Sequence, residues 1–283
     1  MKKEEELVNK VKRLVRKAGL PRWLHHFGPK KYEFWQHGLA FLVKQECRLS
    51  YRRLTQLLRS FGIKVPCYSA LCMSFHRIPS AIWQRLLAAT ASRPYMVAID
   101  GTGISRPLPS PYYYRRIDKP YPVEVPLKLS IIVDTKTKKI LAIRLRAKLA
   151  HDIKDVKYLI NRLHLKPHKL VADKAYDAEW VHRFCAGLGI LAVIPMRDYG
   201  QKKIYRGKSL RKICQKSFKL KTYHRREMAE SVFSAIKRKF GASVSSITLS
   251  AQKAEMYCRA IAHNLFLRIL RLFEQSLKKT EKY

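Results

Sequence analysis

The stretch from Tyr223 to Lys237 reads Tyr-His-Arg-Arg-Glu-Met-Ala-Glu-Ser-Val-Phe-Ser-Ala-Ile-Lys, and the interpretation of the chain starts from it. As a helix it advances about 100° per residue. Four polar residues then fall on one stripe roughly 60° wide: Tyr223, Arg226, Glu230 and Lys237. One interpretation is an amphipathic helix with ion pairs on its solvent face. The other is a surface that holds a metal ion on Glu230 beside a phosphodiester that Arg226 and Lys237 contact.

The composition indicates a folded protein with a polyanionic partner. The 283 residues are 47% hydrophobic, which is enough for a packed core, and 59 Lys and Arg against 20 Asp and Glu give a net charge of +39. Nucleic acid is the partner that such an excess favours. A membrane partner is not expected, because the sequence has neither an apolar run of about 18 residues nor a signal-peptide pattern. The six cysteines form no Cys-x-x-Cys pair, so we expect reduced thiols in an intracellular protein and no structural zinc.

Three regions follow one another along the chain. Residues 1–30 form a basic amphipathic segment, and residues 31–93 are expected to be entirely helical. Within the latter, the segment from Ser50 to Pro79 resembles a helix-turn-helix that reads DNA, but a purely structural three-helix unit has the same pattern, so both readings stay open. From residue 94 onwards the pattern changes to strands, and residues 94–283 are expected to form one catalytic domain.

This last region predicts an α/β fold, a mixed sheet with helices on its faces. The expected strands are 95–99, 125–133, 139–146, 169–172 and 191–195, and the expected helices are 151–163, 178–186, 223–237 and 250–277. Asp177 is expected to cap the second of these helices. The basic segment 197–221 is the expected site of extended phosphate contact, and a solvated loop is the alternative.

Two aspartates stand where predicted strands end. Asp100 follows the first strand, with Gly101 and Gly103 allowing a sharp turn, and Asp173 follows the strand at 169–172. Because ligand sites of open α/β sheets lie at the carboxyl ends of strands, both point to one crevice that Glu230 can complete. Three carboxylates suit Mg²⁺ or Mn²⁺, and two such ions would promote phosphoryl displacement on DNA or RNA. The alternatives are a turn-capping role for Asp100 and a local salt bridge to Lys174 for Asp173.

The chain resembles the DDE transposases of prokaryotic insertion sequences, in the group with a Tyr-x2-Arg-x3-Glu-x6-Lys signature. Tyr223 to Lys237 reproduces that spacing, residues 99–103 look like the segment of the first Asp, and residues 172–177 are similar to that of the second, with Ala175 where Gly is more common. Residues 150–152 and 262–265 resemble further recurring pieces.

The resemblance implies a ribonuclease H-like fold with Asp100, Asp173 and Glu230 as catalytic ligands of Mg²⁺ or Mn²⁺, with two ions expected. It implies cleavage at the ends of the element and joining of the 3′-hydroxyl ends to target DNA. The resemblance also implies that DNA is bound by Tyr223, Arg226 and Lys237. The expected partners are double-stranded DNA and, because two ends are brought together, a second copy of the chain. The expected location is the cytoplasm, at the nucleoid.

The same chemistry leaves two alternatives open. One is a metal-dependent nuclease or resolvase on this fold, and the other is a non-catalytic DNA-binding derivative. A further pair, His151 and Asp152, stands at the start of the helix 151–163. We expect Asp152 to cap that helix, and a position close to the site is the alternative.

Overall fold

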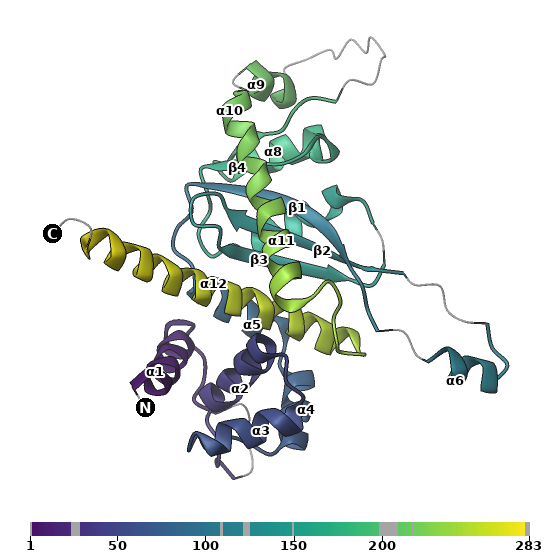
Figure 1. The fold of residues 1–283 in the computed structure, drawn as a ribbon. Helices are drawn as coiled ribbons and strands as arrows, with labels where there is room; N and C mark the ends of the chain where they lie inside the picture. The colour runs from purple at the N-terminus through teal and green to yellow at the C-terminus, as the bar shows by residue number, and fades with distance from the viewer. Residues whose placement is uncertain are drawn as a thin grey trace. The chain divides into compact units, whose positions relative to one another are not determined.

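The computed structural model describes residues 2–23, 29–107, 110–120, 125–148, 150–197, 209–216 and 218–280. The chain divides into two compact units (Figure 1). The first combines Met1–Ala91 with Ser246–Tyr283, and the second is Ser92–Ser245. No helix in the described ranges combines the length and the apolar character needed to cross a membrane. All six cysteines are free thiols.

The first unit is helical. Its helices are α1 (Lys2–Lys17), α2 (Phe34–Cys47), α3 (Tyr51–Ser60), α4 (Tyr68–Arg77), α5 (Ser80–Ala89) and α12 (Leu249–Thr280). Aromatic rings form its centre, with the Phe41 centroid 4.9 Å from that of Phe75 and 6.0 Å from that of Trp83. Ser50 caps α3 by accepting a hydrogen bond from the Arg53 amide, as its position in the sequence predicts.

The C-terminal helix α12 belongs to this helical unit. It packs against α2, α4 and α5, and the Tyr257 hydroxyl donates a 3.3 Å hydrogen bond to Gln84. The sequence assigns this helix to the catalytic domain 94–283, because it follows the signature helix in the chain. Ala254, Tyr257 and Ile261 of this helix are buried. The compact units thus divide the chain differently from the predicted catalytic region 94–283, which stays a prediction.

The second unit is a five-stranded mixed sheet with helices around it. Its strands are β1 (Met96–Ile104), β2 (Leu127–Asp134), β3 (Ile140–Arg146), β4 (Lys169–Val171) and β5 (Leu191–Val193), in the order β3-β2-β1-β4-β5. The pairs β1–β2 and β2–β3 are antiparallel, whereas β1–β4 and β4–β5 are parallel. This is the ribonuclease H-like mixed sheet that the resemblance implies, and the predicted fold class is confirmed.

Short helical segments connect and cover the strands. They are α6 (Pro111–Arg116), η1 (Asp152–Asp155), α7 (Val156–Asn161), η2 (Lys174–Tyr176), α8 (Glu179–Gly187), α9 (Leu210–Lys216), α10 (Leu220–Tyr223), η3 (His224–Arg226) and α11 (Glu227–Phe240). The sequence does not predict α6 and α9. Helix α11 lies across β1 and β2 (Figure 1). Of the basic residues expected in the loop 197–221, those at 202, 203, 206 and 208 lie outside the described residues.

Opposite faces of the sheet carry α11 and η1. Successive side chains of a strand point to opposite faces. The carboxylate of Asp100 faces Arg226, just before α11, whereas a Cβ on Gly101 would meet Asp152 of η1. The two residues are neighbours on β1, so side chains of other segments contact this part of the strand on both faces of the sheet.

Candidate functional site

Asp100 and Asp173 lie just beyond the carboxyl end of the parallel pairing between the neighbouring strands β1 and β4. The parallel pairing of β1 with β4 ends at Ala98 and Val171, and each aspartate stands two residues further on. The sequence places Asp100 at the end of its strand, which is wrong, because β1 continues to Ile104 in antiparallel pairing with β2. At Asp100, β1 is therefore still hydrogen-bonded to β2 on one side, whereas its pairing with β4 on the other side has already ended.

The signature segment brings its residues to this position. It is not one regular α-helix, as the sequence predicts, because the 3₁₀ turn η3 separates α10 from α11. The contact one turn apart is kept, with Arg226 Nη1 2.7 Å from Glu230 Oε1. The same nitrogen lies 3.7 Å from Asp100 Oδ2. One guanidinium group thus stands between two of the three predicted carboxylates.

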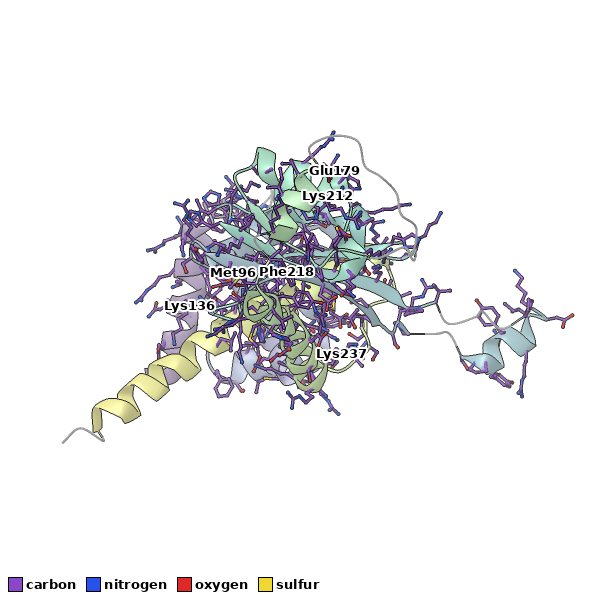
Figure 2. The ribbon with its side chains drawn as sticks, turned by 90° about the horizontal axis from the view of Figure 1, so that it is seen from above. Met96, Lys136, Glu179, Lys212, Phe218 and Lys237 are labelled. Atoms are coloured by element: carbon purple, nitrogen blue, oxygen red, sulfur yellow. The ribbon has the colours of Figure 1, made fainter. Side chains whose placement is uncertain are left out.

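The remaining signature residues meet the same strands. The Tyr223 hydroxyl donates a 3.4 Å hydrogen bond to Asp173 Oδ1, and Lys237 Nζ lies 2.8 Å from Thr102 Oγ1. Thr102 is two residues after Asp100, so both side chains face α11. Figure 2 shows nitrogen-tipped side chains projecting from much of the chain, with Lys237 among those labelled. The structure therefore brings all six predicted site residues to one region of the α/β unit.

The turn-capping role weighed for Asp100 is present, and Asp173 contacts the backbone amide of Lys174 in place of the expected salt bridge. Asp100 Oδ1 accepts a 2.8 Å hydrogen bond from the Gly101 amide. Asp173 Oδ1 accepts a 2.7 Å hydrogen bond from the Lys174 amide and so caps η2. Each bond uses one carboxylate oxygen, and Arg226 approaches the other oxygen of Asp100. Turn formation and a functional role are therefore compatible at both positions.

Burial gives Asp100 an unusual electrostatic environment. Desolvation raises the pKa of its carboxyl group above the ordinary value, although the Gly101 amide and Arg226 act in the opposite direction. The charges of Glu230 and Asp152 add to the increase. The ionised form of Asp100 is thus under-compensated by the surrounding protein, and a perturbed carboxyl group beside further carboxylates is typical of a functional site.

A comparison with protein families fits this arrangement. The transposase DDE domain model matches residues 91–265, which contain both aspartates and the signature segment. The chain belongs to the DDE transposase domain family. It is also similar to a cryo-EM structure of the piggyBac transposase synaptic complex with hairpin DNA, at 10% identity over 96% of this chain and 74% of that chain, with a TM-score of 0.46. No curated protein matches the chain. The transposase family is confirmed, while the prokaryotic origin and the signature group stay predictions.

The carboxylates of the transposase domain suit a divalent cation by donor type, but basic side chains contact them. Within the described ranges, no three His, Cys, Asp or Glu side chains lie close enough together to hold a metal ion. Arg226 contacts Asp100 and Glu230, and Lys128 pairs with Asp152. Carboxylate oxygens are nevertheless the ligands that Mg²⁺ and Mn²⁺ prefer. By donor type Asp100, Asp173 and Glu230 could hold such a cation, and Arg226 is the present counter-ion of two of them.

Sequence reasoning gives Asp152 the wrong role. The residue at the N-cap of η1 is His151, no side-chain hydrogen bond caps the turn, and the Asp152 carboxylate pairs with Lys128 of β2. A signal was present, because a glycine inside a strand often marks a close approach by another group. Gly101 is such a glycine, and Asp152 lies against it.

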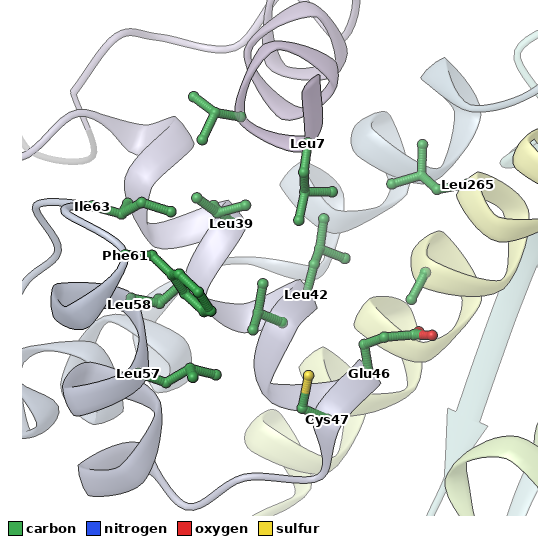
Figure 3. A pocket seen from close by; sticks show the side chains of 13 residues that line it. Leu7, Leu39, Leu42, Glu46, Cys47, Leu57, Leu58, Phe61, Ile63 and Leu265 are labelled. Carbon is green, nitrogen blue, oxygen red and sulfur yellow. The ribbon is translucent and has the colours of Figure 1, made fainter. Parts of the chain in front are cut away.

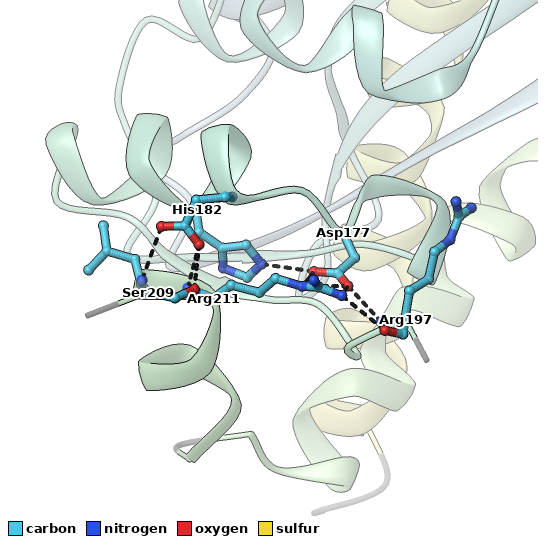
Figure 4. A network of polar contacts seen from close by, with 7 residues as sticks. Asp177, His182, Arg197, Ser209 and Arg211 are labelled. Atoms are coloured by element: carbon cyan, nitrogen blue, oxygen red, sulfur yellow. Dashed lines mark hydrogen bonds and ion pairs between the residues drawn. The ribbon is translucent and has the colours of Figure 1, made fainter. Parts of the chain in front are cut away.

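A second group of carboxylates in the α/β unit is fully engaged by the chain itself (Figure 4). Asp177 accepts hydrogen bonds from the Arg197 amide at 2.6 Å and from Arg211 Nε at 2.7 Å, and His182 Nε2 lies 3.4 Å away. Glu179 accepts a 2.6 Å hydrogen bond from the Ser209 hydroxyl and bonds from the first two amides of α9. Ala178, not Asp177 as expected, is the N-cap residue of α8. This network ties α9 to α8.

The helical unit contains an apolar cavity of about 310 Å³ (Figure 3). Side chains from α1, α2, α3 and α12 line it, including Leu39, Leu58 and Phe61. Glu46 is the one acidic residue in its lining. This composition does not suit phosphoryl chemistry, so the candidate site is the group of carboxylates in the α/β unit.

Proposed function

We propose that this DDE transposase protein cleaves DNA at the ends of a prokaryotic insertion sequence and joins the 3′-hydroxyl ends to target DNA. One observation carries the proposal: Arg226 Nη1 reaches both Asp100 and Glu230, although these residues come from distant parts of the chain. A guanidinium group between two carboxylates marks a position of concentrated negative charge. A divalent cation is bound most favourably at such a position.

Asp100, Asp173 and Glu230 would hold Mg²⁺ or Mn²⁺, and two ions are expected. When bound, these ions supply electrostatic stabilisation to the attacking and leaving oxygens of the phosphodiester. The chain's own basic groups complete the site. Arg226, released from the carboxylates, can pair with a phosphate through two parallel hydrogen bonds, as a planar guanidinium group does.

Two further signature residues would position DNA. Lys237 is anchored by Thr102 on the same face of β1 as Asp100, so its ammonium group can contact a phosphate next to the carboxylates. Tyr223 hydrogen-bonds to Asp173, and its ring lies tilted against that of Phe218, with 5.7 Å between the ring centroids. An aromatic hydroxyl in this position can donate to a phosphate oxygen or support a neighbouring base.

The predicted regions 1–30, 31–93 and 94–283 would divide the work, with helices of residues 31–93 contacting DNA outside the catalytic region. Helix α3 exposes Arg52, Arg53 and Arg59, which suits contact with the phosphate backbone. The connection from α3 to α4 is longer than the roughly three- to four-residue turn of a helix-turn-helix. We therefore favour backbone contact over base reading for this region. Two copies of the chain would bring two ends together at the nucleoid, in the cytoplasm.

The test is incubation of the full-length protein with labelled DNA that carries the flanks of its own gene, with Mg²⁺ or Mn²⁺ and with Asp100→Ala as control. Nicks at fixed flank positions and new joined products, both absent with Asp100→Ala, are the expected result. Cleavage without joining would instead indicate a metal-dependent nuclease or resolvase. DNA binding without a metal-dependent product would indicate a non-catalytic binding protein and contradict the proposal.

A further inference from the structure

We propose that a second pocket of the helical unit binds one nucleotide of DNA whose base is unstacked, either in a single strand or turned out of a duplex. The pocket has a volume of about 360 Å³, and its lining comes from the segment before α2 and from α2, α4 and α5. This inference rests on the proposed function, because it takes DNA as the ligand. It adds a binding site outside the signature segment and the three predicted carboxylates.

The charged side chains of the pocket favour an anion. Among the described residues that line it, Lys31 and Arg77 carry a positive charge, and neither Asp nor Glu is present. Both cations are exposed, so a phosphate group can reach them from solvent. The described lining of the cavity in Figure 3 has the acidic Glu46 and no basic residue. A phosphate group therefore suits the pocket at Lys31 and Arg77 and does not suit that cavity.

The rest of the lining suits the planar face of a base. Tyr32 supplies an aromatic ring, and Met73 and Ile82 supply apolar side chains. Pro66 and Pro79 add rigid walls, because the proline ring fixes its own backbone angle. Met73 is 53% exposed, so this apolar surface is open to a ligand. Every base can stack on such side chains, and this stacking is tolerant of sequence.

A hydrogen-bonded pair adds a polar group to the same lining. The Ser74 hydroxyl donates a 3.0 Å hydrogen bond to the Leu71 carbonyl oxygen, and Ser74 Oγ lies 3.0 Å from His37 Nδ1. Because a hydroxyl group has one proton, His37 Nδ1 is the donor in the second contact. Ser74 Oγ then keeps a lone pair that can accept a hydrogen bond from an N–H group of a base.

The pocket continues the basic surface that α3 exposes. Arg52 of α3 lies over the ring of Tyr68 at the start of α4, with 5.0 Å between the guanidinium carbon and the ring centroid. Further along α4, Ala70, Met73 and Arg77 are three and four residues apart, so they share one face of the helix, and all three are exposed. A DNA strand held by phosphate contacts on α3 can therefore extend along α4 to the pocket.

The experiment measures binding of the full-length protein to two labelled duplexes of one sequence by fluorescence anisotropy, in EDTA, so that no divalent cation supports cleavage. One duplex is fully paired, and the other carries an additional unpaired thymidine in its middle. The unchanged protein should bind the duplex with the unpaired thymidine about tenfold more tightly, because stacking of one base on an aromatic side chain has effects of this size.

Two variants show whether the pocket causes this preference. Tyr32→Ala removes the stacking ring, and Ala70→Glu places a negative charge in the lining at an exposed helical position that tolerates Glu. Each should reduce the preference to about twofold or less. Ala81→Glu is the matched control, because Ala81 is exposed on α5 and is absent from the described lining. It should keep the preference, and circular dichroism checks that each variant is folded.

Competition with dTMP alone separates a free nucleotide from a nucleotide within DNA. Phosphates held on α3 raise the effective concentration of a linked nucleotide, so dTMP in about hundredfold excess should leave the preference intact. Loss of the preference at that excess would assign the pocket to a free nucleotide and overturn DNA as its ligand.

The remaining outcomes distinguish this inference from the proposed function. Equal affinity of the unchanged protein for the two duplexes, or a preference that Tyr32→Ala and Ala70→Glu both retain, would overturn the pocket. The cleavage assay with Asp100→Ala would then still decide the proposed function by itself. If the unchanged protein binds neither duplex, DNA is not its ligand, and both proposals fall.

Discussion

Asp100 and Asp177 are two substantially buried aspartates of one α/β unit, and their surroundings shift their pKa values in opposite directions. Asp177 has a fully buried side chain. Burial raises its pKa, but the nearby His182 ring and the hydrogen bonds from Arg211 and the Arg197 amide outweigh that effect and lower it. At Asp100 burial prevails, and the pKa is raised. Where the chain's own donors outweigh burial, a carboxylate stabilises the fold. Where they do not, we interpret the carboxylate as one that awaits a positive charge from outside the chain.

The largest effect on stability is expected from Asp177→Asn. This change removes the charge that Arg211 and His182 face in a buried position, so the free energy of unfolding should fall by about 2–4 kcal/mol. Urea denaturation followed by circular dichroism measures it. A loss below about 0.5 kcal/mol would mean that the network in Figure 4 does not hold α9 in solution.

The pH dependence of stability follows from the same group. Because the pKa of Asp177 is lower in the folded than in the unfolded protein, its contribution is present above the unfolded value of about 3.9 and is lost as the pH falls through the folded value. The pKa of Glu179 is also lowered, since hydrogen bonds from Ser209 and the α9 amides outweigh its burial. We expect the unfolding free energy to fall below about pH 4, and to fall less steeply in Asp177→Asn. Equal slopes for the two proteins would contradict the assignment.

Asp100→Asn should change the free energy of unfolding in the opposite direction from Asp177→Asn. It removes a carboxylate whose ionised form is disfavoured by burial, so in EDTA the variant is expected to be more stable than the unchanged protein, by up to about 1 kcal/mol. Thermal unfolding in EDTA and in Mn²⁺ provides the measurement. Added Mn²⁺ should stabilise the unchanged protein more than the variant. If the variant were less stable in EDTA than the unchanged protein, Asp100 would be a structural carboxylate like Asp177.

The smallest effect is expected from Lys237→Ala. Loss of one phosphate contact should weaken DNA binding several-fold for all sequences and reduce the slope of the logarithm of affinity against that of salt concentration by about 1. Arg183→Ala is a suitable control, because Arg183 is highly exposed and pairs with Glu179. An unchanged salt slope in Lys237→Ala would show that Thr102 holds this lysine away from DNA.

Local spacing could be predicted from the sequence. The spacing of Arg226 and Glu230 predicts their contact one turn apart, and the contact is present even though η3 interrupts the helix. The adjacency of Asp100 and Asp173 follows from the parallel pairing of β1 with β4, because each aspartate stands two residues after the last paired residue of its chain segment. The true end of β1 could not be predicted, because antiparallel pairing with β2 extends it beyond the end of β4.

Contacts between side chains of distant segments could not be predicted from the sequence. Asp177 resembles an N-cap, yet Arg211, 34 residues away, engages it instead. Asp152 resembles a cap for the same reason and is held by Lys128 on another strand. Capping is a local pattern that one sequence displays, whereas the partner of a buried charge depends on how the whole unit packs. The same limit applies to α12. Its apolar face can be recognised in the sequence, but the helices that this face packs against cannot.

The central claim is that the carboxylates Asp100, Asp173 and Glu230 perform chemistry and do not hold DNA or the fold. The most direct test compares Glu230→Gln with the unchanged protein for Mg²⁺-dependent cleavage and for DNA affinity on the same labelled fragment. Cleavage should fall by about 100-fold or more, with DNA affinity changed by no more than about twofold, because the substitution removes a ligand charge and little else. A loss of affinity as large as the loss of cleavage would contradict the claim.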